Sequence, residues 1–82
     1  MDNKNNIKTR LVRIIKDSFA EFDLDESSIQ AIDLIEDLGM DSVTFITIVI
    51  QIEEEFKITI PDELLLMENF KNINLIMHFF DL

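Results

Sequence analysis

The chain has 82 residues, no Cys, and 17 acidic residues against 7 basic ones, which gives a formal net charge of −10 at pH 7. Because so acidic a chain repels phosphate backbones, and because disulfides and thiolate zinc sites need Cys, nucleic-acid-binding, disulfide-stabilised and zinc-thiolate proteins are excluded. A hydrophobic content of 48% excludes a disordered chain, and the length predicts a single domain over residues 1–82.

The first predicted element is a helix that runs to Phe22. Its inner residues recur at steps of three and four, with Lys and Arg between them: Ile7, Leu11, Ile14, Ile15, Ser18, Phe19 and Phe22. Asn5 or Asn6 can cap its start. The first residues are polar and no continuous apolar run follows them, so the pattern predicts no secretory signal peptide.

Charge is unevenly distributed along the chain. Residues 1–16 hold five basic residues and one acidic residue, whereas residues 17–82 hold two basic and sixteen acidic residues. The basic first helix can therefore pair with the acidic remainder or present a solvated charged face, and exposed ion pairs contribute little to stability. The sequence leaves both alternatives open.

The segment after the first helix begins like a calcium-binding loop. Asp23, Asp25 and Ser27 resemble the opening of an EF-hand loop. The turn position, however, holds Ser28 in place of Gly, and the position of the bidentate carboxylate holds Leu34. We therefore expect no metal site. For residues 29–38, which mix apolar and acidic side chains, a short helical turn and an extended loop remain alternatives.

Residues 43–56 fit two kinds of secondary structure. Their many β-branched residues favour a strand. Against this, Phe45, Val49, Ile52 and Phe56 recur at steps of four, three and four, and Asp41 can cap a helix start, so we predict a helix over residues 41–56. The apolar run of ten residues in this segment is too short to span a membrane, which takes roughly 20. With no leader and no membrane span, we expect a cytoplasmic protein.

The C-terminal third is predicted to form a short helix and a final helix. Pro61 suits the first helical position, residues 64–67 should be mostly packed, and Asn69 should end this short helix. Apolar residues at helical spacing define the final helix: Phe70, Ile73, Ile76, Met77 and Phe80. The predicted fold is all-α, a small helical bundle of three main helices plus one short helix.

Candidate catalytic residues are scarce. His78 is the single histidine, and it lies beside core-type residues with no evident partner for a nucleophile and base pair. The acidic triplet of residues 53–55 is most simply a solvated face. We therefore expect no catalytic residue and no enzymatic activity.

Ser42 stands at the start of the predicted second helix, shortly after Gly39. A hydroxyl at a helix N-terminus is exposed among free backbone N–H groups, and the helix dipole there favours a negatively charged phosphate group. Such a hydroxyl is well placed for modification with a phosphodiester. From these residues alone, a helix cap formed by Asp41 or Ser42 is the simpler interpretation.

Three segments together resemble the acyl carrier proteins. They are Glu-Asp-Leu-Gly-Met-Asp-Ser-Val at 36–43, Ile-Glu-Glu-Glu-Phe at 52–56 and Ile-Thr-Ile-Pro-Asp-Glu at 58–63. The resemblance runs from about Phe19 to Phe80. It implies that a separate Mg-dependent phosphopantetheinyl transferase attaches 4′-phosphopantetheine from coenzyme A covalently to Ser42. The arm would then carry acyl, aminoacyl or peptidyl groups as thioesters, on a chain that is itself no enzyme. Separately from the resemblance, we expect a monomer.

The resemblance also implies partners and the residues that meet them. The partners are the transferase, an acyl- or aminoacyl-activating ligase or an acyltransferase, and downstream synthase enzymes. The implied partner-binding residues are Asp41, Val43, Ile50, Glu53, Glu54, Ile60, Asp62 and Met67. For the apolar members of this set, core packing is the competing interpretation.

Some residues depart from the pattern of fatty-acid carriers. Thr44 and Thr47 stand where such carriers usually place acidic residues, and Val43 replaces the more usual leucine. Partners with basic surfaces would therefore meet fewer charges near Ser42. We predict a carrier for a specialised pathway, such as polyketide or nonribosomal peptide synthesis, with fatty acid synthesis as the other possibility. The alternative function is an unmodified helical protein-interaction module.

Overall fold

The computed structural model describes residues 3–25 and 27–80, with side chains described from Asn6 onward. Three α-helices form the frame: α1 (Asn3–Ser18), α2 (Ser42–Phe56) and the short α3 (Ile73–Met77). Four 3₁₀ helices lie between and after them: η1 (Ile29–Ala31), η2 (Asp62–Leu64), η3 (Met67–Phe70) and η4 (His78–Phe80). The described residues contain no strand, so the predicted all-α bundle is confirmed.

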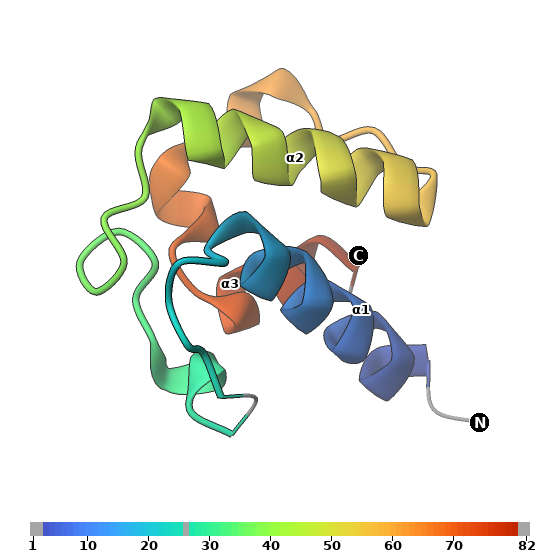
Figure 1. The fold of residues 1–82 in the computed structure, drawn as a ribbon. Coiled ribbons are helices and arrows are strands. Elements are labelled where there is room, and N and C mark those ends of the chain that lie inside the picture. Colours follow the sequence, from blue (N-terminus) through green and yellow to red (C-terminus); the bar gives the residue numbers. More distant parts are fainter. Residues whose placement is uncertain (1–2, 26, 81–82) are drawn as a thin grey trace.

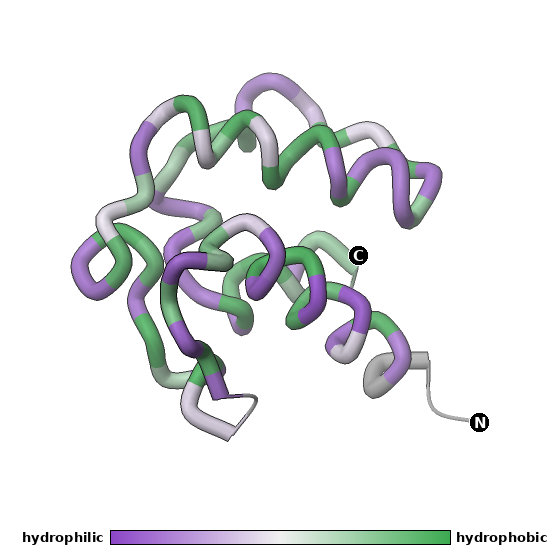
Figure 2. The backbone as a smooth tube through the Cα atoms, in the orientation of Figure 1, coloured by the Kyte–Doolittle hydropathy of each residue, from purple (hydrophilic) through white to green (hydrophobic). Residues whose placement is uncertain are grey.

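The core forms where the apolar faces of α1, α2 and α3 meet. Helix α1 lies below α2 in Figure 1, and the chain from η3 through α3 to η4 closes the remaining side. Among the side chains described, none that is polar or charged is buried. Figure 2 shows hydrophobic residues recurring along each helix. The largest fully buried side chains are Phe70, Leu11, Ile15, Ile29, Leu34, Ile48, Ile52, Ile73 and Ile76.

Helix α1 differs from its prediction at both ends. It begins at Asn3, so neither Asn5 nor Asn6 is the cap, and it ends at Ser18, four residues before Phe22. The backbone N–H of Phe22 donates to the carbonyl of Phe19 at 3.0 Å, which replaces the helical hydrogen-bond pattern with a tight turn. Phe22 therefore leaves the inner face and is 38% exposed.

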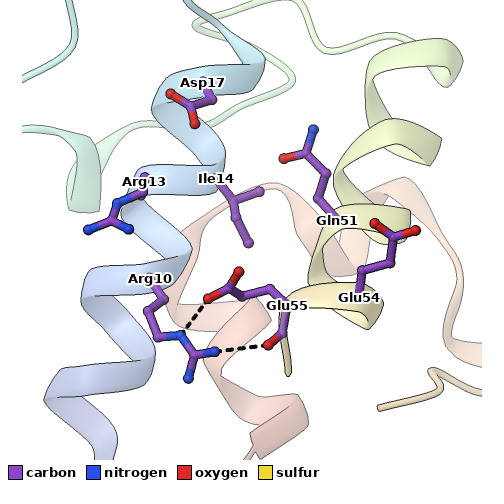
Figure 3. Close-up of a pocket in the computed structure, with 7 residues that line it drawn as sticks. All are labelled: Arg10, Arg13, Ile14, Asp17, Gln51, Glu54 and Glu55. Carbon is purple, nitrogen blue, oxygen red and sulfur yellow. Dashed lines mark hydrogen bonds and ion pairs between the residues drawn. The ribbon is translucent and has the colours of Figure 1, made fainter. Parts of the chain in front are cut away.

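The sequence left two alternatives for the basic residues of α1, pairing with acidic residues or exposure to solvent, and both occur. Arg10 reaches across to α2, where its Nε lies 2.7 Å from Glu55 Oε2 and its Nη2 donates to the Glu55 carbonyl at 2.9 Å (Figure 3). Its guanidinium carbon also lies 4.6 Å from the Phe56 ring centroid. Arg10 and Arg13 both line a pocket of about 270 Å³ between α1 and α2. Arg13 is exposed and has no ion-pair partner within the described residues. One basic residue thus pairs and another is solvated.

The segment with conflicting signals is helical, as predicted. Helix α2 buries Phe45, Ile48, Val49 and Ile52, which follow the helical period, so packing of one face overrides the strand propensity of the β-branched residues. Within the described part of the chain, no helix is long and apolar enough to cross a membrane. The undecided stretch 29–38 contains the three-residue helix η1, and turns follow it.

The C-terminal third is more broken than predicted. Pro61 is the residue before η2 and not its first helical residue, and Asn69 lies inside η3 and does not end a helix. Leu66 is 58% exposed, so the prediction that residues 64–67 are packed is wrong for this residue. The final helix begins at Ile73 because the Asn72 side chain accepts the Leu75 N–H at 2.8 Å and caps a new start.

Lys57 ends α2 in a left-handed conformation, with φ of 56° and ψ of 46°. This conformation costs an ordinary L-residue roughly 1–2 kcal/mol, whereas glycine adopts it freely. After the entropy that glycine adds to the unfolded chain, Lys57→Gly is expected to stabilise the fold by about 0.5–1 kcal/mol. Thermal melts followed by circular dichroism measure this gain. Lys57→Ala is the control, because it removes the charge and keeps the strain, and an equal gain in it would contradict the explanation.

Candidate functional site

Ser42 is the first residue of α2, and its neighbour Asp41 caps the helix. Asp41 has extended backbone angles, and its Oδ1 accepts the Thr44 N–H at 2.9 Å. The Ser42 hydroxyl is exposed and makes no hydrogen bond with any described residue. Of the two capping residues that the sequence allowed, Asp41 is the cap. The Ser42 oxygen is therefore not engaged in holding the helix.

Hydrogen bonds from Thr44, foremost from its backbone N–H, hold the pKa of Asp41 below its ordinary value of 3.8. The physical cause is that a hydrogen-bond donor at a helix N-terminus favours the charged form of a carboxyl group. Asp41 thus places a carboxylate directly before Ser42. Because Asp41 is exposed, this charge is available to a partner that approaches the serine.

A lowered folded-state pKa makes the cap dependent on pH. The stabilisation by the Asp41 carboxylate is complete above the unfolded pKa and is lost as pH falls through the lower folded pKa. The melting temperature of the wild type is therefore expected to exceed that of Asp41→Asn by a constant amount at neutral pH. The difference should shrink as pH falls below 3.8. Paired melts across this range measure it, and a difference independent of pH would contradict the assignment.

Hydrogen bonds between its own residues hold the loop that precedes Ser42. Asp33 Oδ1 accepts the N–H groups of Ile35 and Glu36, both at 2.9 Å, and Asp37 Oδ2 accepts the Asp33 N–H at 2.9 Å. Gly39 turns the chain toward α2 with φ of 69°, a conformation that favours glycine.

The same loop is tied to the start of α3. The backbone N–H of Leu34 donates to the carbonyl of Lys71 at 2.6 Å, and the N–H of Met40 donates to the carbonyl of Leu34 at 2.9 Å. Leu34 is fully buried. These two hydrogen bonds and the buried Leu34 side chain hold the loop that precedes Ser42 against the core. Sequence reasoning missed this role of Asp33 and Asp37, although Asp is a residue that commonly closes such turns.

Helix α2 presents apolar side chains to solvent next to Ser42. Val43 is 75% exposed and Ile50 is 48% exposed, so these two predicted contact residues lie on the surface. Ile46, which the sequence did not single out, is 47% exposed between them. Its signal was present in the sequence, since residues 43, 46 and 50 follow a helical spacing away from the buried positions.

The other predicted partner-binding residues are divided between surface and interior. Glu54 and Asp62 are exposed. Glu53 is half-buried, and its Oε2 accepts the Ile60 N–H at 2.9 Å, so it holds the chain after α2 in place. Ile60 is only 3% exposed and Met67 is half-buried against the core. The core-packing alternative therefore describes Ile60, which is not part of the exposed surface around Ser42.

The surroundings of Ser42 suit a covalently attached phosphodiester arm. Ser42 is exposed, and the N-terminal dipole of α2 favours a negative group close by. Among the described residues, no group of three or more His, Cys, Asp and Glu is placed to hold a metal ion. The site thus offers an accessible hydroxyl oxygen at the start of a capped helix.

Comparisons with known proteins agree on one kind of relative. A family model described as a phosphopantetheine attachment site matches residues 10–80. An acyl carrier protein of Rickettsia bellii (strain OSU 85-389) is 35% identical to the chain over 63 residues, which cover 77% of this chain and 75% of the relative. An acyl carrier protein of Phytoplasma mali (strain AT) is 45% identical over 47 residues, which cover 57% of this chain and 54% of the relative.

Proposed function

Because the chain belongs to the acyl carrier protein family, whose cofactor is a covalently attached 4′-phosphopantetheine, we propose that the cofactor is attached to Ser42. The observation that carries this proposal is the exposed Ser42 hydroxyl, which has no hydrogen-bond partner among the described residues while Asp41 caps the helix. A residue that also served as the cap would lose that role on modification. Ser42 can be modified without cost to α2.

The attachment step transfers a phosphoryl group. The Ser42 oxygen forms a bond to the phosphorus that bears the pantetheine arm of coenzyme A, the bond from that phosphorus to the bridging oxygen breaks, and adenosine 3′,5′-bisphosphate leaves. The hydroxyl proton passes to a base of the transferase. Once attached, the arm supplies a thiol, a group that this chain without Cys lacks. The thiol carries acyl, aminoacyl or peptidyl groups. The chain itself acts as a substrate and partner of enzymes.

The experiment that tests the proposal is modification of the purified chain. The chain is incubated with coenzyme A, Mg²⁺ and a phosphopantetheinyl transferase of broad carrier specificity, and its intact mass is measured. We expect a gain of one phosphopantetheinyl group, located on Ser42 by peptide mapping. An unchanged mass, or a gain located on another residue, would contradict the proposal and favour the unmodified interaction module.

Partner contacts around Ser42 involve both charge and apolar surface. We assign Asp41, Glu54 and Asp62 as exposed acidic contacts and Val43 and Ile50 as exposed apolar contacts. Met67 contributes its exposed part, whereas Glu53 acts mainly by holding the backbone of Ile60. A cytoplasmic location, a monomeric state and a single domain over residues 1–82 stay predictions from the sequence.

The uncharged first turns of α2 support a role in a specialised pathway. Residues 42–51 contain no charged side chain, so a basic enzyme surface finds little to bind there. We expect a cognate adenylating ligase to load the modified chain, and a housekeeping ketoacyl synthase to bind it poorly. Efficient acyl-chain elongation by that synthase on this carrier would contradict a specialised role.

A further inference from the structure

Helix α1 presents a basic row to solvent, on the side of the helix away from the fully buried Leu11 and Ile15. Its residues recur at steps of three, four and three and therefore lie on one face: Asn6, Thr9, Arg13 and Lys16. The first three are exposed and the last is half-buried. We call these four residues the basic stripe. It holds two positive charges and no carboxylate, in a chain of net charge −10.

The two charges of the basic stripe are not used within the domain. Lys8 and Arg10, in contrast, bind other residues of the chain, by a hydrogen bond of 2.6 Å to Gln30 and by the ion pair with α2. Figure 3 shows Arg10 reaching toward α2, whereas Arg13 extends away from it. Neither Arg13 nor Lys16 makes an ion pair or a side-chain hydrogen bond within the described residues. Both charges are therefore available to a partner.

A shallow cavity lies along the basic stripe. It has a volume of about 240 Å³ and is lined by Thr9, Arg13 and Lys16, and by one acidic residue, Asp17. Sites for small molecules usually have roughly 300–1,000 Å³, so this cavity fits side chains of another protein better than a separate ligand. The hydroxyl, guanidinium and ammonium groups in its wall can all donate hydrogen bonds, and carboxylate oxygens accept them.

Spacing and charge indicate the kind of partner. Arg13 and Lys16 lie about 4.5 Å apart along the helix axis, which is close to one helical turn. Two carboxylates one turn apart on a helix of the partner match this spacing. The net charge of −10 opposes binding of the stripe to a second copy, to nucleic acid or to an anionic membrane, each of which carries a large negative charge.

We propose that the basic stripe is a docking surface for another protein, which binds it through a helix that carries carboxylates one turn apart. The stripe lies on α1 and Ser42 begins α2, and Arg13 points away from α2. A protein bound to the stripe can therefore hold the chain while an enzyme acts at Ser42. This consequence rests on the proposed attachment, whereas the docking surface itself does not.

The test is an NMR titration of the ¹⁵N-labelled chain with a synthetic helical peptide that carries two Glu residues four positions apart. The same peptide with Gln in place of both Glu residues is the control probe. We expect shift changes centred on the stripe and a Kd at low salt that is lower for the Glu peptide by about fivefold or more. Because the contact joins opposite charges, this Kd should rise as salt is added.

The variant Arg13→Glu is expected to raise the Kd of the Glu peptide by about tenfold or more, because it replaces attraction by repulsion. Lys57→Glu is the matched control, since it changes the net charge equally at an exposed residue outside α1. This control should raise the Kd less than about twofold. Arg13→Gln removes the charge alone and should have an intermediate effect. Circular dichroism melts verify that each variant is folded.

Several results would overturn the proposal. No shift change at the stripe with millimolar Glu peptide, equal Kd values for the two peptides, or equal effects of Arg13→Glu and Lys57→Glu would leave the stripe as a solvated face. Co-sedimentation with anionic lipid vesicles that Arg13→Glu abolishes would assign the stripe to a membrane surface. A concentration-dependent dimer that Arg13→Glu abolishes would assign it to a second copy.

The docking surface and the attachment at Ser42 can fail separately. The chain that carries the arm should bind the Glu peptide with the same Kd as the unmodified chain, and loss of binding on modification would contradict simultaneous use of the two sites. If the chain gains no mass with coenzyme A and the transferase but still binds the Glu peptide at the stripe, the attachment fails and the docking surface stands.

Discussion

The substitution Ser42→Ala is expected to abolish all gain of phosphopantetheine, at every transferase concentration and reaction time. The effect is complete because the alanine side chain has no oxygen to form the phosphodiester, and no Cys thiol can replace it. The fold should be unaffected, since the Ser42 hydroxyl is exposed and makes no hydrogen bond with the described residues. Intact-mass analysis measures the loss of modification, and a thermal melt measures the retained fold.

Two controls make the Ser42 result specific. Ser28→Ala removes another exposed serine hydroxyl, which donates to the Asp25 carbonyl at 3.2 Å, and this variant should be modified like the wild type. Thr47→Ala removes an exposed hydroxyl on α2 itself, where the Thr47 Oγ1 donates to the Val43 carbonyl at 2.9 Å. A mass gain that survives in Ser42→Ala would place the attachment elsewhere.

The long elements of this fold could be predicted from the sequence because a single buried face determines each of them. Helix α2 shows this best, since Phe45, Val49 and Ile52 mark the helical period within a run of strand-favouring residues, and all three are buried. Asp41 as a cap could be predicted for a similar reason. A cap is a local interaction between residues three positions apart, and it needs no knowledge of the rest of the fold.

Features that depend on distant contacts could not be predicted in this way. The loop before Ser42 is held by the hydrogen bond from Leu34 to Lys71, two residues far apart in the chain. Ile60 and Ile46 are the same residue type, yet one is 3% exposed and the other 47% exposed. Side-chain type does not distinguish them, because exposure is decided by which face of an element another element covers. The helical register indicates that Ile46 faces away from the buried positions of α2, whereas Ile60 lies in a non-helical connector where no local pattern indicates its burial.

The substitution Phe70→Ala is expected to destabilise the fold by about 3–5 kcal/mol. Phe70 in η3 is fully buried. Its ring packs edge-on against Phe45 of α2 at a centroid distance of 5.2 Å and stacks on Phe79 of η4 at a centroid distance of 5.0 Å. Alanine leaves a cavity at this junction and removes both ring contacts. A small domain has a total stability of about 5–15 kcal/mol, so the melting temperature should fall by on the order of 12 °C or more.

Two matched substitutions separate the causes of this loss. Phe70→Leu keeps most of the apolar volume and removes the two ring pairs, which are worth about 0.5–1.5 kcal/mol each, so its loss should lie well below that of alanine. Phe22→Ala removes a ring that is 38% exposed and that pairs, within the described residues, with one aromatic ring, that of Phe19, at a centroid distance of 6.4 Å. Its cost should be about 1 kcal/mol or less. If Phe22→Ala and Phe70→Ala cost the same in chemical denaturation, the junction of η3 with α2 and η4 is not the centre of the core. If instead Phe70→Ala unfolds the chain at moderate temperature and Phe22→Ala does not, the buried contacts of η3 with α2 and η4 are necessary to the fold.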